Sequence, residues 1–313
     1  MRALIIDRST PRGIRLGEAE PPRPAPHQAL VRVAATSLNF GEVSHGIATA
    51  APGVVLGWDA AGLVEEAAAD GSGPPVGTPV LTIGADGGWA ELRAVDTGAL
   101  GSVPPGSTDP GALSTLPVAG LSALRALRRC GPVSGKRVLV TGATGGVGRF
   151  AVRLAHAEGA RVTASTGDPD EHGDALLALG ADEIVHGPEH ADGEWDAVVD
   201  TVGGQQLVDS FAKLAAHGTL VAVGDVTSRP VTFPPGAFLG SENRHGRAIV
   251  TFHSLDGPAP GPDLEHLARL MAEQVLTPHI GWRGDWSRAD EAIDLLNSRR
   301  LHGKAVLDVP TVR

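Results

Sequence analysis

Residues 137–157 read RVLVTGATGGVGRFAVRLAHA, and this stretch decides the fold. The apolar run RVLVTGA (137–143) predicts a buried strand, and the apolar spacing within 145–159 predicts a helix. The turn between them contains Gly142, Gly145, Gly146 and Gly148. Glycines in such a turn let the backbone approach a pyrophosphate group at the N-terminus of the helix. The stretch therefore predicts a dinucleotide-binding strand-turn-helix unit.

Two other interpretations of this turn have less support. The strict G-x-G-x-x-G pattern is not met, because Ala143 stands where its first glycine would fall, so a turn with a purely structural role is one alternative. A Walker A phosphate loop is excluded, because Arg149 follows the turn in place of Gly-Lys-Ser/Thr. A second predicted strand ends about 20 residues further on, which favours the dinucleotide interpretation.

Strands and helices alternate after this turn. Further strands are predicted at 160–166, 183–187, 195–203, 219–225 and 247–254, and helices at 170–180 and 205–216. Repeated alternation of this kind is typical of a doubly wound parallel sheet.

The remaining segments have a different pattern. Residues 1–119 are rich in Gly and Pro, and their short apolar runs predict strands at 3–7, 29–38, 54–67 and 78–83. A helix is predicted over 121–130, and the tail predicts helices at 264–276 and 287–300 and a strand at 304–309. We expect an α/β protein in which residues 1–119 and 257–313 form one discontinuous, barrel-like β-rich domain around a nucleotide-binding domain at 120–256.

The composition excludes several classes of protein. The chain has 313 residues, a net charge of −10 and a single cysteine, Cys130. An acidic balance argues against nucleic acid or an anionic membrane as the partner, and one cysteine excludes an internal disulfide and a four-cysteine zinc site. No apolar run approaches the roughly 18 residues of a membrane helix, and the apolar start is too short for a signal peptide. We expect a cytoplasmic protein.

Motifs along nearly the whole chain identify a resemblance to a known family. They are SLNFGEV (37–43), GWDAAG (57–62), GGWAEL (87–92), LPVAGLSALRAL (116–127), VLVTGATGGVG (138–148), LGAD (179–182), VVDTVGG (198–204) and GKAVL (303–307). In this order and spacing they resemble the medium-chain dehydrogenase/reductase superfamily, in its zinc-independent quinone oxidoreductase-like branch. The resemblance implies a GroES-like catalytic domain, a Rossmann domain that binds NAD(P)H, and a homodimer joined through the edges of the Rossmann sheets.

The positions of the zinc ligands in this superfamily are altered. Zinc alcohol dehydrogenases place a Cys near position 39 and Gly-His-Glu where this chain has Gly57-Trp58-Asp59. Without the thiolate and the imidazole, four-coordinate zinc is improbable, so no metal is expected. His186 and His190 have a metal-like spacing, and the favoured interpretation is that they are surface histidines in a loop.

The resemblance also implies a set of cofactor contacts. They are Asn39, Ser122, Gly142, Thr144, Gly145, Gly146, Val147, Gly148, Ser165, Thr166, Val202, Val223, Gly224, Phe252 and Lys304.

The second strand bears on the choice between NADPH and NADH. It ends at Ser165-Thr166-Gly167, without the carboxylate that would bind the free ribose 2′-hydroxyl of NADH. This end favours NADPH, with Ser165 and Thr166 as hydroxyl donors. The next segment, DPDEHGD (168–174), lacks an Arg or Lys to bind the 2′-phosphate, so NADH remains possible; the acids there also suit a helix N-terminus.

Candidate catalytic residues follow from the L-N-x-x-[DE] segment. The resemblance places Asn39 near the nicotinamide ribose, and an Asn that caps a turn is the alternative. Related enoyl reductases use a tyrosine as proton donor, but this chain has no tyrosine, and Ser44 and His45 are the nearest proton-bearing side chains. Loss of an acid favours an acceptor that takes hydride unaided, such as a quinone.

Two further expectations concern an apolar pocket for the acceptor and an alternative function. The candidates for lining a flat pocket, each with core packing as the alternative, are Trp58, Trp89, Phe252 and Trp282. We expect a reductase of a small-molecule quinone or conjugated enone. The other hypothesis is a cofactor-binding protein without redox turnover, such as a sensor or a redox-neutral cyclase.

Overall fold

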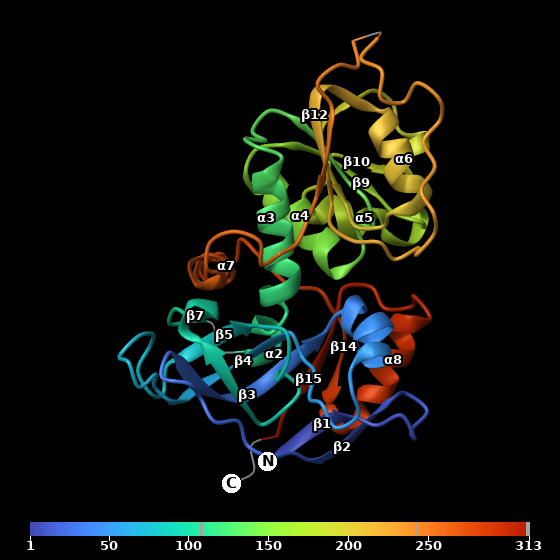
Figure 1. Ribbon diagram of the computed structural model, residues 1–313. Helices are drawn as coiled ribbons and strands as arrows, with labels where there is room; N and C mark the ends of the chain where they lie inside the picture. Colours follow the sequence, from blue (N-terminus) through green and yellow to red (C-terminus); the bar gives the residue numbers. More distant parts are fainter. Residues whose placement is uncertain (107–108, 242, 311–313) are drawn as a thin grey trace. The chain divides into compact units, whose positions relative to one another are not determined.

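The chain divides into two compact units. The computed structural model describes residues 1–106, 109–241 and 243–310 (Figure 1). The β-rich unit contains residues 1–121 and 257–313, and the parallel-sheet unit contains residues 122–256.

A six-stranded sheet forms the centre of the parallel-sheet unit. Its strands are β8 (Arg137–Val140), β9 (Arg161–Ser165), β10 (Glu183–Val185), β11 (Trp195–Asp200), β12 (Leu214–Ala222) and β13 (Ala248–Thr251). All neighbours are parallel, and the strand order is β10-β9-β8-β11-β12-β13. The chain therefore reverses direction across the sheet between β8 and β11, where ligands bind in such folds at the carboxyl ends of the strands. The predicted doubly wound parallel sheet is confirmed.

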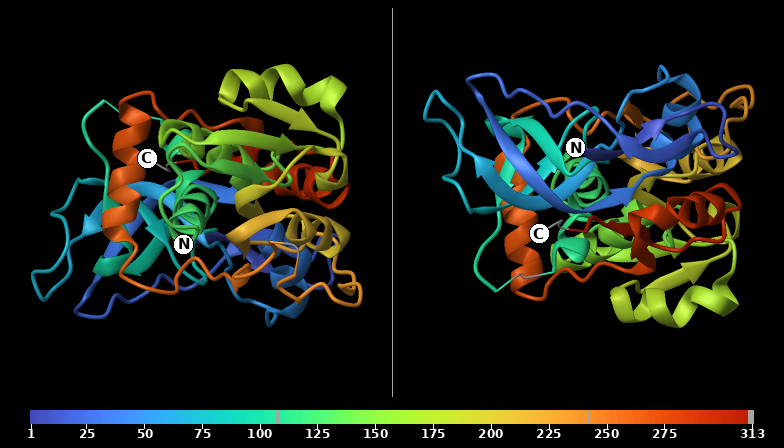
Figure 2. Two further views of the ribbon diagram at one scale, coloured as in Figure 1. Left: turned by 90° about the horizontal axis from the view of Figure 1, so that it is seen from above. Right: turned by 90° about the horizontal axis from the view of Figure 1, so that it is seen from below.

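Helices flank this sheet. They are α3 (Leu121–Arg129), α4 (Gly146–Ala157), α5 (Pro169–Leu179), the short η4 (Pro188–His190) and α6 (Gly204–Ala212). Helices α5 and α6 lie on opposite faces (Figure 2), as right-handed crossovers on either side of a reversal require. The predicted helix over 205–216 ends at Ala212, because the chain must return to the sheet: Leu214 pairs with Trp195, and both are fully buried.

Antiparallel strands dominate the β-rich unit. They are β1 (Arg2–Ile6), β2 (Ile14–Glu18), β3 (Gln28–Leu38), β4 (Asp59–Glu66), β5 (Pro79–Ile83), β6 (Leu92–Asp96), β7 (Leu100–Ser102), β14 (Ile280–Asp285) and β15 (Lys304–Asp308). Strands β1 and β2 form a hairpin, and the other seven form one sheet of order β14-β15-β3-β4-β5-β7, with β6 paired to β3.

Two details of this sheet position side chains of the site. Ala305 of β15 pairs with Leu38 of β3, so Lys304 comes next to Asn39. The predicted strand at 54–67 forms only from Asp59, because Gly57 has φ +111° and lies so close to the backbone of Trp89 that a Cβ would be 2.3 Å from its nitrogen. Strands β2, β6, β7 and β14 were not expected from the sequence.

The helices of the β-rich unit are mostly short. They are η1 (Glu42–Gly46), α1 (Ile47–Thr49), η2 (Thr97–Ala99), α2 (Pro110–Leu113), η3 (Leu116–Gly120), α7 (Gly261–Ala272), η5 (Trp286–Arg288) and α8 (Ala289–Asn297). Trp89 and Trp286 are nearly completely buried in the core beside α8 and β15. Across the described parts of both units, no helix has the length and apolar character needed to cross a membrane.

Candidate functional site

The glycine turn, residues 141–148, connects β8 to α4 as predicted. Gly142 has φ +60°, and a Cβ there would lie 2.4 Å from Thr201 Oγ1; a Cβ on Gly148 would lie 2.2 Å from Gly142 O. Both positions therefore require glycine. Gly145 is the N-cap of α4, and outside its chain neighbours a Cβ there would meet Gly142 O, at 3.3 Å, among the described residues.

The N-terminus of α4 at this turn can bind a phosphate group. Gly145 is the N-cap of a 12-residue helix, whose first-turn backbone N–H groups and dipole attract anions. The residues of the turn therefore fit the pyrophosphate of a dinucleotide.

Most of the other expected cofactor contacts lie at the carboxyl ends of the parallel strands. Ser165 and Thr166 lie at the end of β9, Val202 follows β11, Val223 and Gly224 follow β12, and Phe252 follows β13. The N–H groups of Val223 and Gly224 both donate to Asp200 O, at 2.7 and 3.3 Å. Ser122 lies in α3 and is 5% exposed. Asn39 and Lys304 belong to the β-rich unit.

Asp200 supports this edge of the sheet, and the sequence analysis does not include it among the site residues. Its buried carboxylate accepts hydrogen bonds from Thr141 Oγ1 at 2.5 Å and from Gly203 N at 3.0 Å, while Thr201 Oγ1 donates to Thr141 O at 2.8 Å. Burial raises the pKa of Asp200. An Asp directly after the apolar run AVV (197–199) was the signal available in the sequence.

The β-rich unit contains a buried charged cluster of Asn39, Glu42, Asp59 and Lys304. Asn39 Nδ2 donates to Glu42 Oε2 at 2.9 Å and to Asp59 Oδ2 at 3.2 Å. Asn39 Oδ1 accepts from Lys304 Nζ at 2.5 Å. Two carboxylates and one ammonium therefore determine which way the amide points.

The side chain of Lys304 is held within this cluster. The resemblance implies a cofactor contact for it, but its side chain is 5% exposed, and its ammonium donates to Leu38 O at 3.0 Å and to Asn39 Oδ1, and lies 3.7 Å from Asp59 Oδ2. The ammonium therefore makes two hydrogen bonds and one ion pair. Lys304 therefore orients Asn39 and neutralises Asp59.

The carboxylates of the cluster are completely buried. Glu42 accepts hydrogen bonds from the backbone N–H groups of Trp58 and Asn39, at 2.5 and 2.8 Å. Burial and the negative charge of Asp59 nevertheless raise the pKa of Glu42 to about 8. Asp59 Oδ1 has no hydrogen-bond partner among the described residues.

Arg93 adds a second buried cation beside the cluster. It is 2% exposed and donates to the carbonyl oxygens of Gly57 and Trp58, both at 3.1 Å, and to Thr82 Oγ1 at 2.8 Å. Burial lowers its pKa to about 10. Arg93 was not predicted from the sequence, because an Arg in a strand is expected at the surface unless the fold shows that it is buried.

The two expected proton donors lie on the outer side of the same helix that directs Glu42 inward. Ser44 and His45 in η1 are exposed, and Ser44 Oγ donates to Phe40 O at 2.7 Å. The structure therefore does not bring them into the buried charged cluster.

The aromatic candidates are packed in different ways. Trp89 is fully buried in the core, so the packing interpretation is correct for it. Trp58 packs against Gly41, where a Cβ would lie 2.7 Å from its ring. The guanidinium groups of Arg288 and Arg129 lie over the rings of Trp282 and Phe252, at 5.6 and 5.1 Å.

The residues at the zinc positions do not fit zinc. Asn39, Trp58 and Asp59 offer no thiolate or imidazole, and the ammonium of Lys304 already contacts the oxygens of Asn39 and Asp59. His186, Glu189 and His190 place possible ligand atoms within 4.8 Å of one another, but all three are exposed, and a ring nitrogen of His190 lies 2.6 Å from His186 O.

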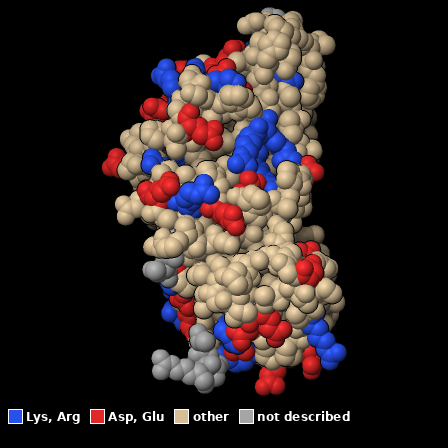
Figure 3. All heavy atoms as spheres, turned by 90° about the vertical axis from the view of Figure 1, so that its left-hand side faces the viewer, with Lys and Arg blue, Asp and Glu red and all other residues tan. Residues whose placement is uncertain are grey.

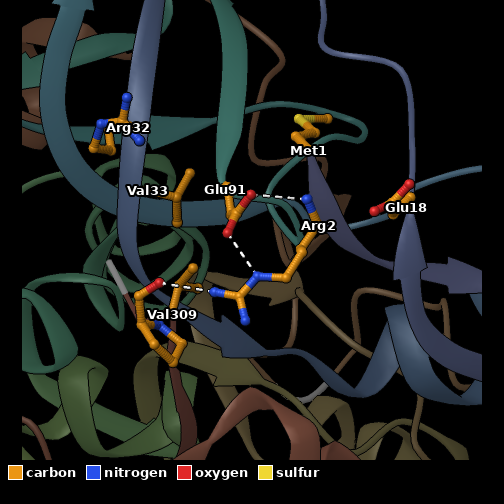
Figure 4. Close-up of a pocket in the computed structure, with 8 residues that line it drawn as sticks. Met1, Arg2, Glu18, Arg32, Val33, Glu91 and Val309 are labelled. Atoms are coloured by element: carbon orange, nitrogen blue, oxygen red, sulfur yellow. Dashed lines mark hydrogen bonds and ion pairs between the residues drawn. The ribbon is translucent and has the colours of Figure 1, made fainter. Parts of the chain in front are cut away.

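A surface pocket of about 360 Å³ in the β-rich unit contains none of the expected site residues. Figure 4 shows that Arg2 and Glu91 in this pocket are paired. Arg2 Nε lies 2.8 Å from Glu91 Oε1, and another Arg2 nitrogen donates to Pro310 O at 3.2 Å. On the face of the molecule in Figure 3, basic and acidic side chains lie among each other.

Comparisons with known proteins agree with this architecture. An alcohol dehydrogenase GroES-like domain matches residues 25–105, and a zinc-binding dehydrogenase domain matches residues 179–307. The acryloyl-coenzyme A reductase of Metallosphaera sedula is 29% identical over 228 residues, which are 71% of this chain and 65% of that protein. The acryloyl-coenzyme A reductase of Sulfurisphaera tokodaii is 25% identical over an alignment that includes 98% of this chain and 99% of that protein.

A solved structure extends the similarity to the whole fold. The quinone oxidoreductase from Coxiella burnetii superimposes with a TM-score of 0.84 at 25% identity, over 99% of both chains. A GroES-like domain and a Rossmann domain with a glycine turn define a nicotinamide-dependent oxidoreductase. The chain belongs to the medium-chain dehydrogenase/reductase superfamily and is similar to its quinone oxidoreductases.

Proposed function

We propose that the protein is a zinc-independent reductase that transfers hydride from NADPH to a quinone or a conjugated enone or enoyl acceptor. The observation that carries the proposal is the ammonium of Lys304 among the oxygens of Asn39 and Asp59, at positions where zinc-dependent relatives hold their metal. Similarity to acryloyl-coenzyme A reductases and to a quinone oxidoreductase supports the acceptor class.

Asn39 is the residue we propose to bind the nicotinamide ribose. Both hydrogens of its amide nitrogen are used by Glu42 and Asp59, and one lone pair of Oδ1 is used by Lys304. One lone pair of Oδ1 remains, and it can accept a hydrogen bond from a ribose hydroxyl. The bound cofactor supplies the hydride, and the chain supplies the orientation.

Proton delivery distinguishes the possible acceptors. The oxygens of Glu42 accept N–H groups and the side chain is fully buried, so Glu42 does not reach an acceptor. Ser44 Oγ donates its hydrogen to the carbonyl oxygen of Phe40, which leaves His45 as the candidate proton donor. Reduction of a quinone does not require it, because water can protonate the aromatic hydroquinone anion.

A screen of NADPH oxidation over quinones, 2-alkenals and enoyl thioesters tests this function. We expect turnover with at least one class, and a His45→Ala variant that keeps its rate with quinones. Cofactor binding without oxidation of NADPH by any of the three classes would instead support the sensor or the redox-neutral cyclase.

We also propose that the protein is a homodimer joined through β13. This strand is the outermost in its sheet and has one neighbour, β12, so its other edge is free to pair with β13 of a second copy. Light scattering should give a mass of twice 32.0 kDa. A monomeric mass at micromolar concentration would contradict the dimer.

A further inference from the structure

Arg149 is an unpaired cation beside the glycine turn. It follows Gly148 in α4, its side chain is half-buried, and its Nε donates to Thr144 O at 3.3 Å. Among the residues that the structure describes, no carboxylate pairs with this guanidinium. A half-buried charge without a counter-ion is costly, which makes the position suitable for an anionic ligand.

Backbone contacts place Arg149 near the end of β9. Thr144, whose carbonyl holds Arg149, directly follows Ala143, and Ala143 N donates to Ser165 O at 3.0 Å. In a Rossmann unit the group on the adenosine 2′ position lies between this turn and the end of the second strand. The guanidinium of Arg149 therefore lies at the glycine turn, near the carboxyl end of β9.

Ser165 gives a second, independent indication of a ligand. Its side chain is 1% exposed, and its hydroxyl has no hydrogen-bond partner in the described structure. A buried hydroxyl without a partner is uncommon and costs free energy unless a ligand or water satisfies it.

The acidic segment after β9, residues 168–174, does not occupy the region between the glycine turn and the end of β9. Asp168 is exposed, and its Oδ1 accepts a hydrogen bond from Glu171 N at 2.9 Å as the N-cap of α5. Thr166 Oγ1 accepts from Asp168 N at 3.3 Å. These acids therefore stabilise the start of α5, as the alternative interpretation of the sequence proposed.

We propose that Arg149 binds the 2′-phosphate of NADPH, together with the hydroxyl groups of Ser165 and Thr144. The proposal rests on the proposed function, in that the cofactor must bind at the glycine turn. An arginine offers two parallel N–H donors to a phosphate, and NADH would leave the guanidinium unpaired. The basic residue missing from 168–174 is thereby supplied by α4.

Two nucleotides that differ by one phosphate test the proposal without any acceptor. Calorimetry measures binding of adenosine 2′,5′-bisphosphate and of 5′-AMP to the wild type and to Arg149→Met, Arg149→Lys and Arg153→Met. Arg153 lies one turn further along α4 and is the matched control for loss of an arginine.

We expect Arg149→Met to weaken binding of the bisphosphate by about ten- to hundredfold and to leave 5′-AMP within about twofold. Arg149→Lys should be intermediate, because lysine keeps the charge and loses the paired donors. Arg153→Met should bind both nucleotides as the wild type does. Circular dichroism and thermal unfolding verify that each variant is folded.

Two results would overturn the proposal, and they are distinguishable. If the wild type binds both nucleotides and Arg149→Met weakens them equally or not at all, Arg149 does not bind the 2′-phosphate, while the proposed function stands. If the wild type binds neither nucleotide nor NADPH, the proposed function fails and this inference fails with it.

Discussion

The glycine turn and the buried charged cluster are built on opposite principles. The turn is formed by consecutive residues, and its important groups are the backbone N–H groups at the N-terminus of α4. The cluster joins residues as far apart as Asn39 and Lys304, 265 positions along the chain, and its polar groups mostly bind one another. The first region is arranged to receive a ligand, and the second to hold a side chain in one orientation.

This difference determines how each region responds to substitution. A change at the N-terminus of α4 should affect ligand binding more than folding. A change in the cluster removes a partner from a buried charge, so it affects stability before it affects the reaction.

The largest effect is expected for Gly145→Asp. A Cβ at this position would meet Gly142 O at 3.3 Å, which requires a shift of a few tenths of an ångström, so we expect the variant to fold. Its carboxylate lies at the N-terminus of α4 and repels a pyrophosphate. Titration of cofactor fluorescence should show no binding of NADPH or NADH. The control, Gly145→Ala, should bind both within about tenfold of the wild type.

An unchanged affinity in a folded Gly145→Asp variant would show that the cofactor does not bind at the turn. Gly148→Asp, which the sequence alone suggests as an equivalent test, is unsuitable. A Cβ there would lie 2.2 Å from Gly142 O, so loss of binding would report a damaged turn rather than a blocked ligand.

The next effect, on stability, is expected for Lys304→Met. The methionine matches the length of the lysine but leaves Asp59 without its nearest cation and Asn39 Oδ1 without its donor. Removing one partner of a buried ion pair costs about 3–5 kcal/mol, and urea unfolding should show a loss of this order. A loss below about 1 kcal/mol would mean that the cluster is open to water.

The sequence predicted the turn because all of its determinants are local. Glycine spacing and the apolar periods of 137–143 and 145–159 specify a strand, a tight turn and a helix without reference to the rest of the chain. The parallel direction of the strands likewise followed from their alternation with helices.

The cluster could not be predicted in the same way. Lys304 reaches Asn39 because β15 pairs with β3 in one particular register, and nothing in GKAVL specifies that register. The direction of Arg149 likewise depends on where Thr144 O lies in the folded turn. Short strands such as β2, with one buried residue in five, have no apolar period strong enough to be recognised.

A comparable effect on stability is expected from pH acting on Glu42. Its pKa is about 8 in the folded protein and 4.5 when unperturbed, so between these values the folded state holds more protons than the unfolded state. Stability should therefore fall as the pH rises from about 5 to 8, by on the order of 4 kcal/mol.

Urea unfolding of the wild type and of Glu42→Gln across this pH range isolates the contribution. The stability of the wild type should fall relative to the variant as the pH rises, because glutamine cannot ionise. Glu66→Gln, at an exposed position of β4, is the control for the substitution itself. A constant difference between wild type and Glu42→Gln would show that Glu42 stays ionised throughout.

The smallest effect, none at all, is expected from removal of metal. Zinc needs deprotonated ligands and prefers sulfur or imidazole, whereas the donors here are an amide and a carboxylate oxygen beside an ammonium. A divalent ion at this place would have to displace Lys304 and would meet its positive charge at close range. Exhaustive dialysis against a chelator should therefore leave kcat and KM within error, and elemental analysis should find no stoichiometric zinc. One zinc per chain that leaves together with activity, and restores activity on return, would show that the buried charged cluster rearranges into a metal site and that Lys304 is not its resident cation.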